Sequence, residues 1–265
     1  MTLSPIRPFR PWRSAVLLLA AALSGAAEPP TPNTLATIDL AAVAGAPGWW
    51  FTATQGARVP DPVGVDDLVP GPIRLCISRD RGRTCGSAFA QVLGRTAPDD
   101  VFAEPHFLND ARIVEPRRGL RLLLVSVSSV HAVNGDQRVA TVALGHGRNG
   151  FAPVFSKVTR RNNNQEIRYI AAGPLRGAFI IAEPTQDAPF GFWISVEMPG
   201  GQGRYRQVQH FRSATRYGDG NPLAVIDSEM PAILQRAGAW HPGAALPLPA
   251  RGCPAPHLVR GALWC

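Results

Sequence analysis

The segment "PHFLNDARIVEPRRGLRLLLVSVSSVHAVNGDQRVATVALGHGRNGFAPVFSKVT", residues 105–159, decides the fold class. Short runs of aliphatic and β-branched residues are separated by turns rich in Gly, Asn, Asp and Pro, a pattern typical of β-strands joined by hairpins. Helical periodicity is weak throughout the chain. We therefore predict four consecutive strands, at residues 105–114, 120–130, 137–145 and 151–159.

The residues that follow repeat this order. We predict four more strands at 166–173, 177–185, 190–198 and 204–211. A set of four strands that recurs every fifty residues or so is typical of β-propeller blades. The flanking runs fit less regularly: 48–56, 72–78 and 85–94 are expected as the last three strands of an earlier blade, 221–240 as two strands of a later, degenerate blade, and 34–43 as the strand that closes the ring.

The predicted fold is therefore all-β, a small β-propeller of four to five four-stranded blades over residues 34–245. A β-sandwich or an irregular β-meander is the alternative, because short strands with regular turns look similar in these folds. With 45% hydrophobic and 17% charged residues, the chain can bury a substantial core.

Residues 1–27 are expected to be a signal peptide. Three arginines precede the apolar run "AVLLLAAAL" (15–23), and small residues suited to cleavage follow it. A transmembrane anchor is the alternative, although the run is short for a membrane span. Residues 28–33 form a proline-rich linker. We predict a periplasmic or extracellular monomer with no stable membrane anchor after signal cleavage.

Four cysteines lie in the exported part, where disulfides form. They allow three connectivities. The local pairing, Cys76 with Cys85 and Cys253 with Cys265, needs the least rearrangement and would close a tail at residues 246–265. A zinc site is the alternative, but the chain has no C-x-x-C motif and its histidines are far apart. We predict no metal site and no cofactor.

Arginine supplies nearly all of the positive charge, since Lys157 is the only lysine. Loss of the three arginines of the signal peptide lowers the formal net charge from +8 to +5. The arginines are scattered along the sequence and do not form a basic stripe interleaved with aromatic residues. We therefore expect no nucleic-acid partner.

The segment "SRDRGRT" (78–84) is a tight turn between two cysteines. The side chains of Ser78 and Asp80 can hydrogen-bond backbone groups that the turn leaves unpaired, and Gly82 can supply a positive φ. Ser78, Asp80, Gly82 and Thr84 match the pattern S-x-D-x-G-x-T, and in this the chain resembles the Asp-box propellers of the sialidase-like superfamily. The aromatic residue that ends the family motif is Cys85 here.

The resemblance implies a structural role for the motif, on the hairpin between the third and fourth strands of a blade. It also implies that any active centre lies at the opposite end of the blades. The loops expected there are the most polar of the chain. They contain the candidate catalytic residues Tyr217, Glu166, Asp99 and Asp219, and the candidate ligand-binding residues Arg160, Arg161, Arg212 and Arg216.

These residue types suit two functions. Arginines could bind a carboxylate while Tyr, Glu and Asp act as nucleophile, base and acid, as a divergent exo-sialidase-like glycoside hydrolase requires. However, polar loops are normally just solvated, and the Arg-Ile-Pro signature of the family is missing. The preferred hypothesis is an exported, non-enzymatic binding protein with a protein or glycan ligand; an inhibitor or immunity-type partner of a secreted enzyme is a further alternative.

Overall fold

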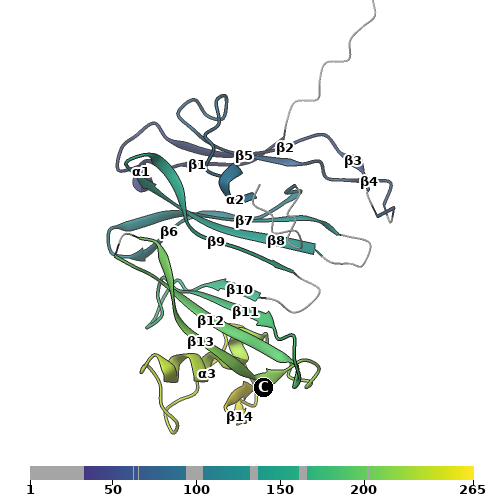
Figure 1. Cartoon of the computed structure of the whole chain (residues 1–265), viewed down its shortest axis with the longest axis vertical. Helices are drawn as coiled ribbons and strands as arrows, with labels where there is room; N and C mark the ends of the chain where they lie inside the picture. The colour runs from purple at the N-terminus through teal and green to yellow at the C-terminus, as the bar shows by residue number, and fades with distance from the viewer. Residues whose placement is uncertain are drawn as a thin grey trace, which may run out of the picture. The chain divides into compact units, whose positions relative to one another are not determined.

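The computed structural model describes residues 33–61, 63–64, 66–93, 104–131, 137–160, 166–201 and 203–265 (Figure 1). The predicted signal peptide and all of the linker except Asn33 lie outside these residues. The described residues belong to one unit, Pro32–Cys265. Among their helices, none is both long enough and apolar enough to cross a membrane.

Two four-stranded antiparallel sheets contain the eight strands that the sequence predicts most clearly (Figure 1). In each sheet the strands keep their order in the chain, so that each pairs with the one before it. We call them the second and third sheets. The second contains β6 (Phe107–Arg117), β7 (Leu120–His131), β8 (Gln137–Gly147) and β9 (Gly150–Arg160); the third contains β10 (Glu166–Tyr169), β11 (Phe179–Pro184), β12 (Gly191–Pro199) and β13 (Tyr205–Arg216).

The first sheet has three strands, β1 (Asn33–Asp39), β2 (Trp50–Gln55) and β5 (Ile73–Ser78). β1 pairs with β2 of the same sheet. The closure of a ring by the strand at 34–43 therefore stays a prediction. The strand predicted at 85–94 is wrong, because its described part forms a turn and the short helix α2 (Ala90–Leu93). Helix α1 (Ala41–Ala44) and the two-stranded sheet of β3 (Val59–Pro60) and β4 (Leu68–Val69) lie in the connections.

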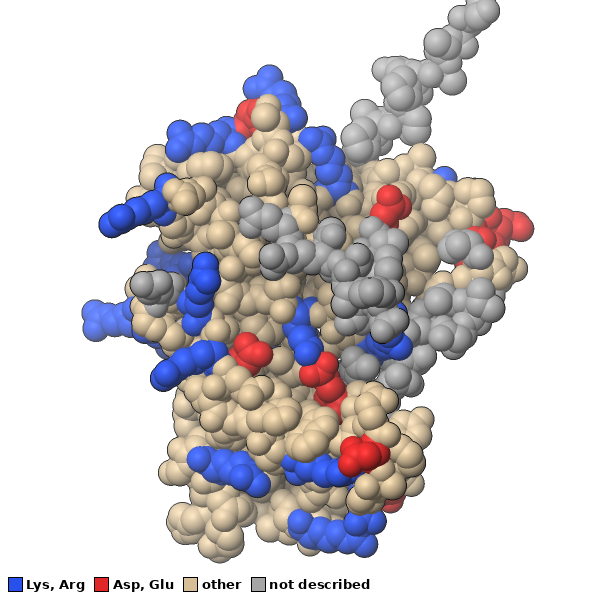
Figure 2. Space-filling model, viewed as in Figure 1, with Lys and Arg blue, Asp and Glu red and all other residues tan. Residues whose placement is uncertain are grey.

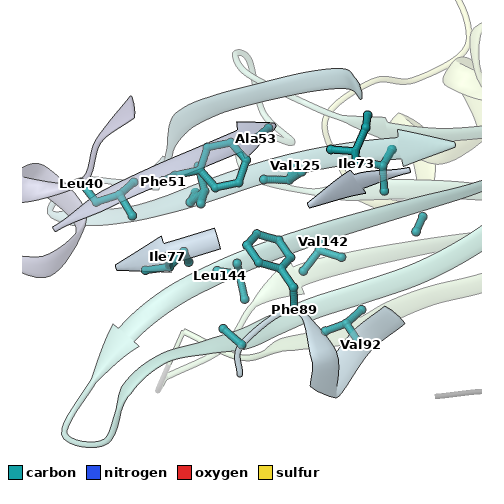
Figure 3. Packing of buried hydrophobic residues seen from close by; sticks show 14 residues of the cluster. Leu40, Phe51, Ala53, Ile73, Ile77, Phe89, Val92, Val125, Val142 and Leu144 are labelled. Carbon is teal, nitrogen blue, oxygen red and sulfur yellow. The ribbon is translucent and has the colours of Figure 1, made fainter. Parts of the chain in front are cut away.

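The first and second sheets pack face to face through a shared hydrophobic core (Figure 3). Phe51 of β2 and Ile77 of β5 belong to the same buried cluster as Val125 of β7 and Leu144 of β8. Phe89, just before α2, places its ring 5.8 Å from that of Phe51. Burial of each such side chain contributes about 1.5–3 kcal/mol, so this core fixes the two sheets against each other.

The opposite face of the second sheet packs on the third sheet. In β7, Leu123 and Val125 face the first sheet, while Leu122 and Leu124 face the third. Successive strand residues point to opposite faces. A strand between two layers therefore needs apolar residues at consecutive positions, which accounts for the unbroken run in β7.

Aromatic and charged contacts join the second and third sheets. The rings of Phe155 in β9 and Phe179 in β11 stack with their centroids 3.8 Å apart. Nearby, Nζ of Lys157 lies 2.8 Å from both carboxylate oxygens of Glu183 in β11. The single lysine of the chain therefore connects the two sheets.

Helix α3 (Val225–Arg236) covers the other face of the third sheet. The two strands predicted within 221–240 are therefore wrong. Ile226 and Ile233, two turns apart on the helix, pack on Ile180 and Ile194 of the sheet. Their burial outweighs the hydrogen bond that Pro231 cannot make in the middle of the helix.

The C-terminal tail is a hairpin of β14 (His257–Val259) and β15 (Ala262–Trp264), closed by the Cys253–Cys265 disulfide. Leu263 is fully buried. Its carbonyl oxygen accepts hydrogen bonds from Nδ2 of Asn221 at 3.0 Å and Oγ of Ser228 at 3.1 Å. The predicted disulfide of the tail is confirmed, and these contacts fix β15 beside α3.

The described residues form an all-β protein with three large antiparallel sheets in sequence order. Strand pairing within these residues does not close a ring. The propeller with four to five blades therefore stays a prediction.

Candidate functional site

The antiparallel sheets have two ends, which we call the turn face and the loop face. The turn face carries the turn after β5 and the connections β6–β7, β8–β9, β10–β11 and β12–β13. The loop face carries the connections β7–β8, β9–β10, β11–β12 and β13–α3. The candidate catalytic and ligand-binding residues that the structure describes belong to loop-face connections or to the strand ends beside them.

The turn after β5 contains the Asp-box residues. The backbone N–H of Gly82 donates to Oγ of Ser78 at 2.6 Å, and that of Thr84 donates to Oδ1 of Asp80 at 3.0 Å. The bond from the Thr84 backbone is the main reason that the pKa of Asp80 falls to about 2. Gly82 has a φ of 96°, and a Cβ there would lie 2.7 Å from Oγ1 of Thr52. These four residues shape the turn and hold it against β2.

The two cysteines beside this turn form a disulfide, Cys76–Cys85, with their Cα atoms 5.0 Å apart. The local pairing predicted from sequence is thus confirmed, and the zinc alternative is wrong for these residues. The backbone N–H of Gly86 donates to the carbonyl of Ile77 at 3.0 Å, but residues 87–93 form no strand. Among the described residues, the first sheet therefore has no fourth strand of the kind that the family resemblance implies.

On the loop face, Glu166 at the start of β10 supports the fold. Its Oε1 accepts a hydrogen bond from Nε of Arg168 at 2.9 Å, and its Oε2 accepts the backbone N–H of Ile226 at 3.1 Å. The first N–H groups of a helix have no partner within it, and Ala224 has no side-chain oxygen to cap them. Glu166 therefore caps α3 from the third sheet.

The guanidinium of Arg168 lies between two carboxylates. Its Nη2 donates to Oδ2 of Asp227, in the first turn of α3, at 3.1 Å, while Glu166 pairs with its other side. Burial alone would lower the pKa of Arg168, but the hydrogen bond to Asp227 and the charges of both acids outweigh it and raise the pKa. This network joins β10 to α3.

The other candidate catalytic residues do not form an acid–base arrangement with Glu166. The side chain of Tyr217 is 63% exposed, and among the described residues its hydroxyl makes no hydrogen bond. Both oxygens of Asp219 accept backbone N–H groups of its own turn, from Arg216 at 2.9 Å and Asn221 at 3.0 Å. Asp99 lies outside the described residues.

The candidate ligand-binding arginines have different surroundings. Arg212 donates to the carbonyls of Asp187 at 2.7 Å and Pro189 at 2.6 Å, so it holds the β11–β12 connection. Arg216 ends β13 and is exposed, and Arg160 ends β9. Arg161 lies outside the described residues.

A carboxyl pair that the sequence did not indicate lies between the second and third sheets. Glu183 is paired with Lys157. Burial raises the pKa of Glu197, while the charge of Lys157 opposes this rise and that of Glu183 adds to it. On the neighbouring strands, Oγ of Ser195 lies 3.0 Å from Nδ1 of His210. Because Ser195 is only 6% exposed, this pair stabilises the sheet and does not present a nucleophile.

The turn face holds two adjoining cavities. One, of about 620 Å³, lies along β9 and the start of β13, and the other, of about 520 Å³, lies between the turns of the second sheet, α1 and residues 203–204. They share Ala152, Pro153, Val154 and Arg204. Arg121, Arg148 and His146 line the smaller cavity, and neither cavity has an Asp or Glu among its lining residues.

Exposed arginines gather on this face. Figure 2 shows blue side chains along its left edge, where the turns of β6–β9 lie in Figure 1. The carboxylates nearby are already engaged, since Glu115 accepts the backbone N–H of Gly119 at 3.1 Å and lies 3.8 Å from Arg121. The fold thus brings to one end of the sheets several arginines that are far apart in the sequence. The arginines of the turns and adjoining strand ends are Arg79, Arg81, Arg83, Arg117, Arg118, Arg121, Arg148, Arg176, Arg204 and Arg206, and all of them are exposed.

The signal that could have revealed this surface is the recurrence of an arginine directly before or after a glycine. Each of the five connections on the turn face contains an arginine next to a glycine: Arg81-Gly82, Arg118-Gly119, Gly147-Arg148, Arg176-Gly177 and Gly203-Arg204.

The chain was also compared with known proteins. No model of a known protein family, no curated protein and no solved structure matches it.

Proposed function

We propose that this chain is an exported, non-enzymatic binding protein whose glycan or protein ligand lies on the turn face. The proposed scaffold is a divergent, sialidase-like array of propeller blades. The order of strands in the second and third sheets and the Asp-box hydrogen bonds support this scaffold. The two disulfides are compatible with export.

The observation that carries the proposal is the pair of adjoining cavities lined by arginine and free of carboxylates. Their volumes lie in the range of about 300–1,000 Å³ that ligand sites typically have. On the loop face, by contrast, Glu166, Asp219 and Arg212 are engaged in holding a helix, a turn and a connection. A binding function on the turn face therefore fits the side chains better than catalysis on the loop face.

Binding of the exported chain to an array of purified glycans and envelope proteins would test this proposal. The variant R148Q/R204Q should lose binding to the ligand found. The matched variant R216Q/R251Q removes the same charge from exposed arginines away from the turn face, and it should bind like the wild type. Equal binding by both variants would contradict the proposed site.

The enzyme alternative has a direct test. The wild type should not hydrolyse fluorogenic sialosides or uronosides. Turnover that is abolished by Tyr217→Phe would overturn the proposal of a non-enzymatic protein.

A further inference from the structure

The five arginine–glycine connections adjoin one another across the three sheets. The ring of Trp49, before β2, lies 5.4 Å from that of Phe151 in β9, which joins the first sheet to the second. Between the second and third sheets, Nη2 of Arg117 donates to the carbonyl of Gly201 at 3.1 Å. The turns therefore form one continuous surface.

Some arginines fix the turns in place. Besides Arg117, Arg176 donates from Nη2 to the carbonyl of Glu115 at 3.1 Å, across the same pair of sheets. Gly177 lies so close to the neighbouring turn that a Cβ would be 2.5 Å from the carbonyl oxygen of Pro116. Close packing of this kind holds the turn backbones in a fixed arrangement, so little ordering is needed when a ligand binds.

The guanidinium groups of other arginines have no partner in the described part of the chain. Arg118, Arg148 and Arg204 are exposed, and their guanidinium groups make no hydrogen bond, ion pair or ring contact with a described residue. Each belongs to a different connection, and Arg148 and Arg204 line the same cavity. The guanidinium group presents several donors that match carboxylate, sulfate or phosphate oxygens. The surface thus offers several separate anion-binding groups on a fixed frame.

Outside the walls of its cavities, the turn face exposes no large hydrophobic side chain among the described residues. Protein interfaces have an apolar core, and proteins that insert into membranes expose apolar side chains. The exposed large hydrophobic side chains among the described residues all lie elsewhere, in the β3–β4 pair, the loop face, the middle of β12 and β13, and the tail: Leu68, Phe190, Tyr217, Trp193, Val208, Leu248 and Leu258.

The tryptophans at this end are already covered. The guanidinium of Arg79 lies 4.7 Å from the ring centroid of Trp49, and that of Arg81 lies 4.4 Å from the ring of Trp50. Proteins that bind single-stranded nucleic acids stack bases on exposed aromatic rings. The covered rings disfavour this use and leave a polar, cationic surface.

We propose that the turn face binds a linear acidic polysaccharide, a hydrophilic chain with carboxylate or sulfate groups at repeated intervals. This inference rests on the proposed function and names the ligand class of the same site. Successive anionic groups pair with Arg118, Arg148 and Arg204 of different turns, and the hydroxyl groups of the sugars suit the glycine-rich backbone and Asn149 around the cavity. Affinity then comes from several weak pairs acting together.

Titration calorimetry with the exported chain tests this inference. The probes are polygalacturonate and heparin, with dextran as the neutral polysaccharide. We expect both acidic chains to bind, more weakly as salt is added, and dextran not to bind. Monomeric galacturonate at the same carboxylate concentration should not compete, because a monomer engages only one arginine at a time.

The variant R118Q/R148Q/R204Q should weaken polygalacturonate binding about tenfold or more, since exposed charge pairs contribute up to roughly 1 kcal/mol each. The matched variant R74Q/R216Q/R251Q removes the same charge from exposed arginines whose guanidinium groups have no partner among the described residues, and it should bind normally. Circular dichroism of both variants verifies that they are folded.

Several results would overturn the inference. One is equal weakening by both variants, which would show attraction by net charge alone. A second is a single-stranded oligonucleotide, or a vesicle of phosphatidylglycerol and phosphatidylcholine, that binds as tightly as polygalacturonate. If a neutral glycan or a protein binds and R148Q/R204Q removes that binding, the inference fails while the proposed function stands.

Discussion

The two ends of the sheets use arginine in opposite ways. On the loop face, Arg168 and Arg212 are enclosed by acids and carbonyl groups and hold a helix and a connection in place. On the turn face, Arg148 and Arg204 line a cavity without carboxylates, and their guanidinium groups have no partner among the described residues. The same residue type therefore stabilises the fold at one end and remains available for binding at the other.

Residue type alone therefore does not identify a site. On the loop face, carboxylates lie beside Arg168 and Arg212, so these charges are satisfied within the protein. On the turn face, the guanidinium groups of Arg118, Arg148 and Arg204 have no partner among the described residues, so these charges face solvent or a ligand. The two ends differ in whether a charged side chain already has a partner within the protein, and not in whether charged side chains are present.

The largest expected effect concerns the loop face. Arg168→Met should lower the free energy of unfolding by about 3 kcal/mol, because it leaves the carboxylates of Glu166 and Asp227 close together without their common partner. Urea denaturation followed by circular dichroism measures the change. Arg216→Met, at an exposed position on the same face, should change stability by less than about 0.5 kcal/mol. A loss for Arg168→Met as small as that of the control would contradict the structural role of the network.

A smaller effect separates two neighbours within the turn face. Arg117→Ala should lower the free energy of unfolding by about 0.5–1 kcal/mol, because the hydrogen bond to Gly201 is lost at an exposed site. Arg118→Ala should leave stability unchanged and weaken ligand binding instead. Differential scanning calorimetry compares the two variants. If Arg118→Ala were the more destabilising, the distinction between arginines that hold the turns in place and arginines that bind the ligand would be wrong.

The smallest effect concerns the pH dependence of the Asp-box turn. The pKa of Asp80 is about 2 in the folded protein, against an ordinary value of 3.8 for an aspartate side chain. Because folding lowers the pKa of Asp80, its ionised carboxylate stabilises the folded protein at pH values above the pKa of the unfolded chain. This contribution is lost as the pH falls toward 2. Asp80→Asn should therefore lower Tm near neutral pH, and its difference from the wild type should narrow between pH 4 and pH 2.

Thermal melts at a series of pH values provide that measurement. Asp67→Asn removes the same charge at an exposed position outside the turn and corrects for the change in net charge. A difference between Asp80→Asn and the wild type that stays constant down to pH 2 would refute the stabilising role of the Asp80 carboxylate.

The strands of the second and third sheets could be predicted because their apolar runs and turns are local signals. The run at 120–130 corresponds to β7, Leu120–His131, and 137–145 to β8, Gln137–Gly147. Helix α3 could not be predicted in this way. Pro231 divides its sequence into two short strand-like runs, and only the sheet beneath it and the cap from Glu166 make the helix favourable.

The candidate site was predicted less well. The polar loops were a reasonable choice by composition, but hydrogen bonds made by Glu166 and Arg212 to distant or adjacent backbone groups cannot be read from sequence. The turn-face arginines lie in five separate connections, each unremarkable by itself. Only strand pairing brings their turns to one end of the sheets.

The position of Lys157 has a practical consequence. A protease specific for lysine has a single bond to cut in this chain, inside β9 at the edge of the second sheet. In the native protein that bond becomes accessible only when β9 detaches and the contact with Glu183 breaks. The rate of this one cleavage therefore reports how often β9 detaches from β8 and from the third sheet, without any label added to the protein.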